Sequence, residues 1–142
     1  MGKYLVVANQ TALSAELTQA LQEKAGQEKG AQFVLVVPAT PVEHLVSDEV
    51  GDASTVAARR AGLALTHLIG HGVPVIGAHV GASSITVAID EAVGARSNDY
   101  VGIIVCTFPP GLSRWLEPRL TEGLETAFHL PVIHVIAQPP HH

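Results

Sequence analysis

The sequence predicts an α/β protein with a doubly wound, mainly parallel sheet, because short runs of Val and Ile alternate with segments of helical spacing. The runs are nearly continuous in hydrophobicity, which is typical of parallel strands that are buried on both faces. Five strands are expected, at Lys3–Ala8, Gln32–Val37, Val73–His79, Tyr100–Cys106 and Pro131–Ile136. Right-handed crossovers between them place helices on both faces of the sheet.

Four amphipathic segments separate these strands. Their apolar residues recur at three- and four-residue spacing, so each segment offers one face to the sheet. In chain order they are Leu13, Leu17, Ala20 and Leu21; Ala57, Ala61, Ala64, Leu65 and Leu68; Ile85, Ala88, Ile89 and Ala92; and Leu116, Leu120, Leu124, Ala127 and Phe128. The expected N-caps are Thr11, Asp52 and Ser83, and the glycines expected at helix ends are Gly30, Gly72 and Gly94.

Length and composition bound the class of protein. A chain of 142 residues is enough for one domain, which we expect at residues 1–137, followed by a flexible tail at 138–142. With 47% hydrophobic and 15% charged residues, the chain is too apolar to be disordered. Its net charge of −5 and the lack of a basic stripe argue against a nucleic-acid partner.

The expected location is the cytoplasm. A single cysteine, Cys106, excludes an internal disulfide and fits a reducing compartment. No signal-peptide cleavage region follows Met1, and every apolar run is far shorter than the roughly 18 residues of a membrane span. We therefore expect neither secretion nor membrane insertion.

The common catalytic and phosphate-binding motifs are missing. No Gly-x-Gly-x-x-Gly follows the first expected strand, and the chain has neither a Gly-Lys-Ser/Thr nor a complete Gly-x-Ser-x-Gly. His67 and His71 lie four residues apart, so one helix face could hold an ion between them. No Glu follows His67 as a zinc-protease motif requires, and a structural role is favoured. Cys106 has no cationic neighbour in sequence and is expected to be buried and unreactive.

The segment after the fourth expected strand remains open to two interpretations. It runs from Thr107 to Leu116 and holds the only Trp and two consecutive prolines. Gly111 permits a tight turn there, and the backbone amides of Ser113 and Arg114, with the Arg114 guanidinium beside them, would bind an anion. Alternatively, this is a rigid loop with its Trp packed on the core. Loops at the carboxyl ends of parallel strands are the usual ligand site of such sheets.

Three stretches resemble the universal stress protein family. They are Asn9 to Ser14 after the first strand, the strand end at Val37, and Gly111 to Leu116 followed by a helix and Leu130 to Val135. The resemblance implies a strand order of 3-2-1-4-5 and a homodimer, often paired through the last strand. The apolar run Val132–Ile136 agrees with such pairing, because an exposed edge of this kind invites association.

The resemblance also implies where a ligand would bind. Asn9 and Val37 correspond to contacts with a base or ribose, and Gly111, Ser113 and Arg114 to an anion site. The glycines that cradle the ATP phosphates in this family are replaced, with Cys106, Pro109 and Pro118 near those positions. Proline has no N–H to donate, so the usual ATP cradle is not expected.

Three hypotheses follow. The first is a stress-related or regulatory, non-enzymatic, cytoplasmic homodimer that binds no ATP or a different small anionic ligand. The second is an ATP- or AMP-binding protein with weak hydrolysis, in which Arg114 or Arg119 replaces the missing amides. The third is an enzyme that uses Cys106 or the pair His67 and His71; it requires an alkylation-sensitive activity or stoichiometric metal.

Overall fold

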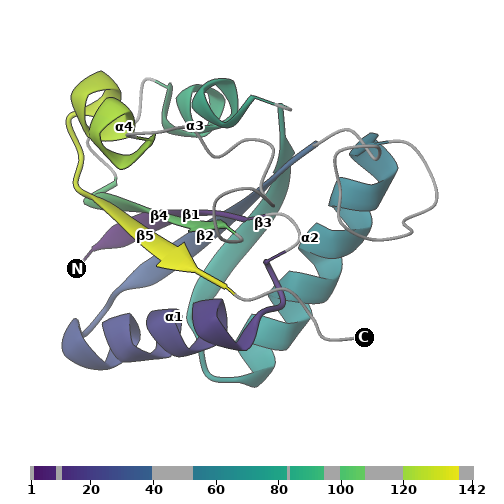
Figure 1. The fold of residues 1–142 in the computed structure, drawn as a ribbon. Helices are drawn as coiled ribbons and strands as arrows, with labels where there is room; N and C mark the ends of the chain where they lie inside the picture. The colour runs from purple at the N-terminus through teal and green to yellow at the C-terminus, as the bar shows by residue number, and fades with distance from the viewer. Residues whose placement is uncertain are drawn as a thin grey trace.

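Strands and helices alternate along the chain (Figure 1). The computed structural model describes residues 2–8, 11–39, 53–82, 84–94, 100–107 and 120–137. Its elements are β1 (Lys3–Val7), α1 (Ala15–Gln27), β2 (Gln32–Pro38), α2 (Ala53–Gly70), β3 (Val75–Gly81), α3 (Ile85–Val93), β4 (Gly102–Thr107), α4 (Leu120–Phe128) and β5 (Val132–Ile136). Each expected strand is confirmed, with its ends displaced by at most two residues.

The five strands form one parallel sheet with the order β3-β2-β1-β4-β5. This order confirms the expected 3-2-1-4-5 arrangement. The central strand β1 pairs with β2 from Lys3 opposite Gln32 and with β4 from Tyr4 opposite Gly102. Because every strand is parallel, the carboxyl ends of all five lie along one edge of the sheet, where α/β folds place their ligands.

Two helices cover each face of the sheet. In Figure 1, α1 and α2 lie below it, and α3 and α4 lie above it. The α1–α2 core contains the strand residues Tyr4, Val6, Phe33, Leu35, Val37, Ile104 and Cys106 and the helix residues Leu17, Leu21, Ala57, Ala61, Ala64 and Leu68. The α3–α4 core contains Leu5, Val7, Val34, Val36, Ile103, Val105 and Val132 with Ile85, Ala88, Ile89, Val93 and Leu124.

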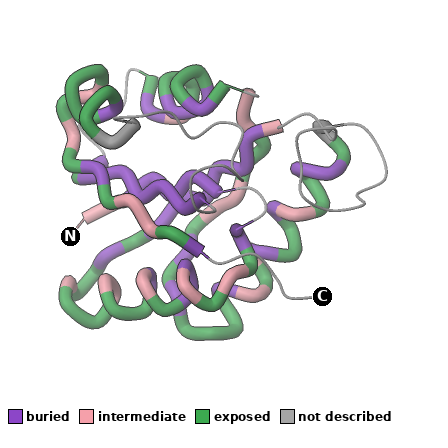
Figure 2. Tube along the Cα trace, viewed as in Figure 1, coloured by how far each residue is buried: buried purple, intermediate pink, exposed green. Residues whose placement is uncertain are grey.

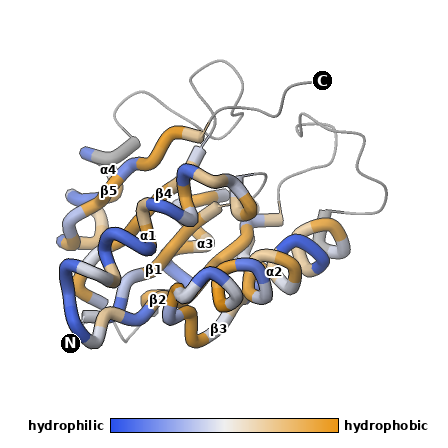
Figure 3. The backbone as a smooth tube through the Cα atoms, turned by 90° about the horizontal axis from the view of Figure 1, so that it is seen from below, coloured by the Kyte–Doolittle hydropathy of each residue, from blue (hydrophilic) through white to orange (hydrophobic). Residues whose placement is uncertain are grey.

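The side chains of the central strands alternate between these two cores, which is why their sequences are apolar without interruption. Figure 2 shows the central strands almost entirely buried, with exposure concentrated on the outer sides of the helices. Seen from below in Figure 3, the strands are largely hydrophobic, and hydrophilic stretches run along the outer side of α1.

Two predicted N-caps are wrong. Ser14, not Thr11, caps α1, since its hydroxyl accepts the N–H of Leu17 at 3.2 Å. Ser84, not Ser83, caps α3 through the N–H of Val87. In each case a hydroxyl residue lies nearer to the helix, and position relative to the first turn decides which one caps it. Asp52 and Ser83 lie outside the described residues.

The glycines expected at helix ends are confirmed, because Gly30, Gly72 and Gly94 all have positive φ. Two stripe residues are corrected. Leu13 precedes α1 and is exposed, and Ala127 points to solvent, because the apolar face of α4 is carried by Leu124 and Phe128. The side chains of Leu116 and Leu120 lie outside the described part.

The two edge strands depart from the expectation of complete burial. Ile76 and Val80 of β3 are exposed, and so are Ile133 and Ile136 of β5. An edge strand is paired on one side only, and four helices do not reach across the full width of five strands.

Candidate functional site at the carboxyl edge of the sheet

The carboxyl edge brings together part of the predicted site. Val37, near the end of β2, and Cys106, near the end of β4, are both fully buried in the α1–α2 core. They flank the end of β1, which continues into Ala8. The other site residues, Asn9, Gly111, Ser113 and Arg114, lie outside the described residues, so their role as ligand contacts stays a prediction.

Thr11 ties the segment after β1 to the end of β4. Its buried hydroxyl donates to the carbonyl oxygen of Cys106 at 2.8 Å, across 95 residues of sequence. The Thr11 carbonyl accepts the N–H of Ser14, which opens α1. Thr11 was expected to cap a helix, and this tether was not predicted. The only signal was a hydroxyl residue shortly after a buried strand, and it does not distinguish between the two roles.

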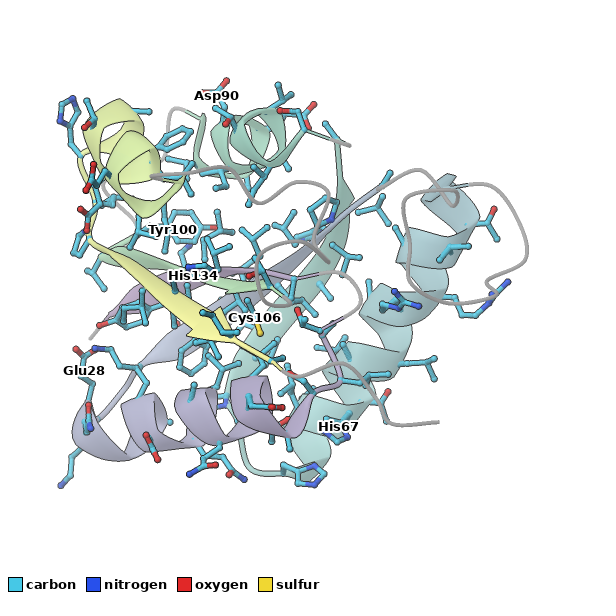
Figure 4. The ribbon with its side chains drawn as sticks, in the orientation of Figure 1. Glu28, His67, Asp90, Tyr100, Cys106 and His134 are labelled. Atoms are coloured by element: carbon cyan, nitrogen blue, oxygen red, sulfur yellow. The ribbon has the colours of Figure 1, made fainter. Side chains whose placement is uncertain are left out.

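Cys106 is confirmed as a buried residue. Its Sγ lies 3.9 Å from the hydroxyl of Ser14 and points toward the side of the sheet that α1 covers (Figure 4). Burial raises the pKa of this thiol, although hydrogen bonds with Thr11 and Ser14 offset part of the rise, and the charge of Glu16 adds to it. A raised pKa leaves little thiolate at neutral pH, whereas a nucleophilic cysteine needs a lowered one.

His134 joins β5 to β4 at the same edge. Its Nε2 lies 2.8 Å from the Thr107 hydroxyl, on the sheet face opposite Cys106. Burial lowers the pKa of His134, so the imidazole favours its neutral form. This contact holds the last two strands together beside the edge where a ligand would bind.

His67 and His71 occupy the last turn of α2 and the residue after it. The Nε2 of His67 contacts the Thr18 hydroxyl of α1 at 3.1 Å, and the Nδ1 of His71 contacts the His67 carbonyl at 2.7 Å. The expected structural role therefore has a physical basis, since His67 links two helices of one layer. Within the described ranges, no group of three or more His, Cys, Asp or Glu side chains could hold a metal ion.

A cavity of about 320 Å³ lies away from these residues, between α3 and strands β2 and β3. Lys3, Tyr100, His79 and Glu91 contribute its polar groups. Lys3 lies over the ring of Tyr100, with 4.8 Å between Nζ and the ring centroid. Val36 lines this cavity, and Val37 points to the opposite face of the sheet, so the described site residue Val37 does not line it.

Strand order, layers and the carboxyl-edge site define the class of protein as a doubly wound parallel α/β fold. Comparison with solved structures identifies the fold more specifically. The universal stress protein from Archaeoglobus fulgidus is 15% identical and aligns with a TM-score of 0.58 over 95% of this chain and 93% of its own. A member of the universal stress protein family from Burkholderia pseudomallei is 16% identical, with a TM-score of 0.59 over 96% of both chains.

This chain therefore has the universal stress protein fold, as the sequence resemblance implied. No protein-family model matches it, and no curated protein does. None of the helices in the described segments has both the length and the apolarity that crossing a membrane requires.

Proposed function

We propose that this chain is a universal-stress-type protein: a cytoplasmic, non-enzymatic, stress-related homodimer that pairs through β5 and lacks the usual ATP phosphate cradle. The fold supports the functional class. The observation that carries the proposal is the outer edge of β5, which offers an apolar surface together with backbone groups that face away from the sheet.

The backbone of β5 shows which groups face outward. The N–H of Ala137 donates to the carbonyl of Thr107, and the carbonyl of Pro131 accepts the N–H of Ile103. Backbone direction alternates along a strand, so odd-numbered residues of β5 face β4 and even-numbered residues face out. Of the outward N–H groups, that of Val132 donates to Glu125 Oε2 at 3.1 Å.

His134 and Ile136 are the other two outward-facing residues of β5. Among the residues that the structure describes, neither has a hydrogen-bond partner for its backbone N–H. Ile133 and Ile136 add large apolar side chains, 40% and 45% exposed. A two-fold axis beside β5 would pair these backbone groups with those of a second copy and bury the isoleucines at the same time.

The missing cradle is supported by the sequence at the carboxyl edge. Prolines at 109 and 118 stand near positions where ATP-binding members of the family have glycines, and they remove amide donors. Asn9, Val37, Gly111, Ser113 and Arg114 then remain as contacts for a different small anionic ligand. A buried Cys106 thiol and the lack of an activated nucleophile in the described part agree with a non-enzymatic role.

Native mass spectrometry of the purified protein, with and without ATP and Mg²⁺, tests both parts. A dimer that gains no nucleotide mass is the expected result. A monomer at micromolar concentration would contradict the pairing. One nucleotide per subunit would contradict the missing cradle and favour the nucleotide-binding alternative, in which case Arg114→Ala should weaken nucleotide binding.

A further inference from the structure

The rings of His67 and His71, at the end of α2, lie close together. The centroids of the His67 and His71 rings are 4.3 Å apart, and the ring planes are tilted by 42°. His67 is partly buried and contacts Thr18 of α1, whereas His71 is exposed. The tautomer of each ring follows from its hydrogen bonds.

His71 contacts a group that can only accept. Its Nδ1 lies 2.7 Å from the backbone carbonyl oxygen of His67. A carbonyl has no proton to give, so Nδ1 carries the hydrogen. In the neutral ring the lone pair is then on Nε2, on an exposed side chain.

His67 is fixed through a hydroxyl with one proton. The Thr18 hydroxyl donates to the Ser14 carbonyl at 3.0 Å, and the same Oγ1 lies 3.1 Å from His67 Nε2. The arrangement that satisfies both contacts has Thr18 donating to Ser14 and accepting from His67 Nε2–H. The lone pair of neutral His67 is therefore on Nδ1.

We propose that His67 Nδ1 and His71 Nε2 together bind one divalent late transition-metal ion, of the Zn²⁺ or Cu²⁺ class. A metal-binding histidine usually donates its other ring N–H to an oxygen, which sets the tautomer and the ring orientation. Both rings here already do so, one to Thr18 and one to a carbonyl. These hydrogen bonds already orient both rings in the folded protein, so ion binding does not have to supply the free energy of orienting them.

The spacing and the ligand count set the strength of the site. Metal–nitrogen bonds of about 2.0–2.1 Å place two imidazole nitrogens on one ion about 3–4 Å apart. The ring centroids of His67 and His71 are 4.3 Å apart, so both rings lie close enough to share one ion. Two protein ligands leave the remaining positions to water, so the affinity is moderate, and Cu²⁺ binds more tightly than Zn²⁺.

Titration with Cu²⁺ tests the site, by calorimetry for affinity and by electron paramagnetic resonance for bound nitrogen. The parent for the experiment carries His141→Ala and His142→Ala, which removes the adjacent histidines at the chain end. We expect one Cu²⁺ per chain with two imidazole nitrogens. His71→Ala should weaken binding at least about tenfold, and the matched control His79→Ala, another exposed histidine, should not.

A second variant tests the tautomer. Thr18→Val keeps the side-chain shape but removes the oxygen that accepts from His67, and we expect it to weaken Cu²⁺ binding by about tenfold while both histidines remain. Thermal unfolding without metal shows that each variant is folded. Equal affinities of the parent and His71→Ala would overturn the proposal, as would a parent that binds no Cu²⁺ below about 1 mM. An unchanged affinity of Thr18→Val would overturn the assigned ligand atoms.

Discussion

The two edge strands of the sheet expose similar side chains, but they differ in how regularly their backbones pair with the neighbouring strand. β3 presents Ile76 and Val80, which are 53% and 41% exposed, and β5 presents Ile133 and Ile136, which are 40% and 45% exposed. Exposed apolar area therefore does not distinguish the edges. The pairing of each strand with its inner neighbour does.

The pairing of β3 with β2 is irregular. Phe33 pairs with Val75 and Val34 pairs with Gly77, so Ile76 is an extra residue without a partner in the register. A bulge of this kind bends an edge strand and spoils its fit to another strand. β5, in contrast, pairs with β4 over five residues without a shift. In the proposed homodimer, the regular backbone of β5, more than its apolarity, is the reason to place the second copy at that edge.

Charge on the outer side of β5 should have the largest effect. In a two-fold pair, Ile136→Lys would bring two like charges together across the axis, and we expect the dimer to weaken by roughly 100-fold. Val80→Lys is the matched control on β3 and should leave the dimer intact. Sedimentation over a concentration series measures both. Dissociation of Val80→Lys alone would identify β3 as the interface and reverse the comparison.

Gly81 and Gly77, both in β3, differ in how closely neighbouring atoms pack against them. A Cβ on Gly81 would lie 2.7 Å from Val36 Cγ1 and 2.8 Å from Ala88 Cβ, so α3 packs closely only because no side chain is present. Gly81→Val should lower the free energy of unfolding by about 2 kcal/mol through overpacking. Gly77→Ala is the control, because its Cβ would meet the His79 ring at an ordinary 3.5 Å. Urea unfolding measures both, and equal losses would refute the packing argument.

Regular elements were predictable from the sequence for a physical reason. Residues such as Leu5, Val6 and Val7 are apolar without interruption because successive side chains face the two cores on opposite sides of the sheet, as in a parallel strand covered on both faces. The stripe through Ala57, Ala61 and Ala64 predicted the buried face of α2 equally well.

Details that depend on tertiary contacts were not predictable. Thr11 was expected to cap a helix, and its hydroxyl instead binds the Cys106 carbonyl 95 residues away. The bulge at Ile76 likewise depends on the neighbouring strand. For the site, the sequence placed Val37 and Cys106 at the right edge and predicted the burial of Cys106. Asn9 was proposed from the resemblance alone, whereas Gly111, Ser113 and Arg114 also followed from the chemistry of the loop after the fourth strand; their ligand contacts stay predictions.

Glu125 binds one of the outward-facing backbone N–H groups of β5, so fewer of these groups are available to a second strand. Its Oε2 accepts the N–H of Val132, the first outward-facing group of the strand. Glu125→Ala leaves that N–H without its acceptor, and we expect a loss of about 1 kcal/mol in the free energy of unfolding. Thr126→Ala, at the next exposed position of α4, is the control. Chemical unfolding compares them. Because Ala forms helix more readily than Glu or Thr, a loss as large in Thr126→Ala would show that the effect does not come from the contact with Val132.

Replacement of His134 should have the smallest effect, which is on the pH dependence of stability. The sign of this effect follows from the burial of the imidazole. Because burial lowers the pKa of the folded imidazole below its ordinary 6.5, the unfolded chain takes up a proton at a higher pH than the folded chain does. The contribution of neutral His134 to stability is therefore complete above pH 6.5 and is lost as the pH falls through the lowered pKa. We expect His134→Gln to flatten the decline in melting temperature between about pH 7.5 and 5.5. His79→Gln, the matched exchange on β3, should keep the decline of the parent protein. If both variants keep it, protonation at the β5 edge does not contribute to acid sensitivity, and the Thr107 contact acts only as a neutral hydrogen bond.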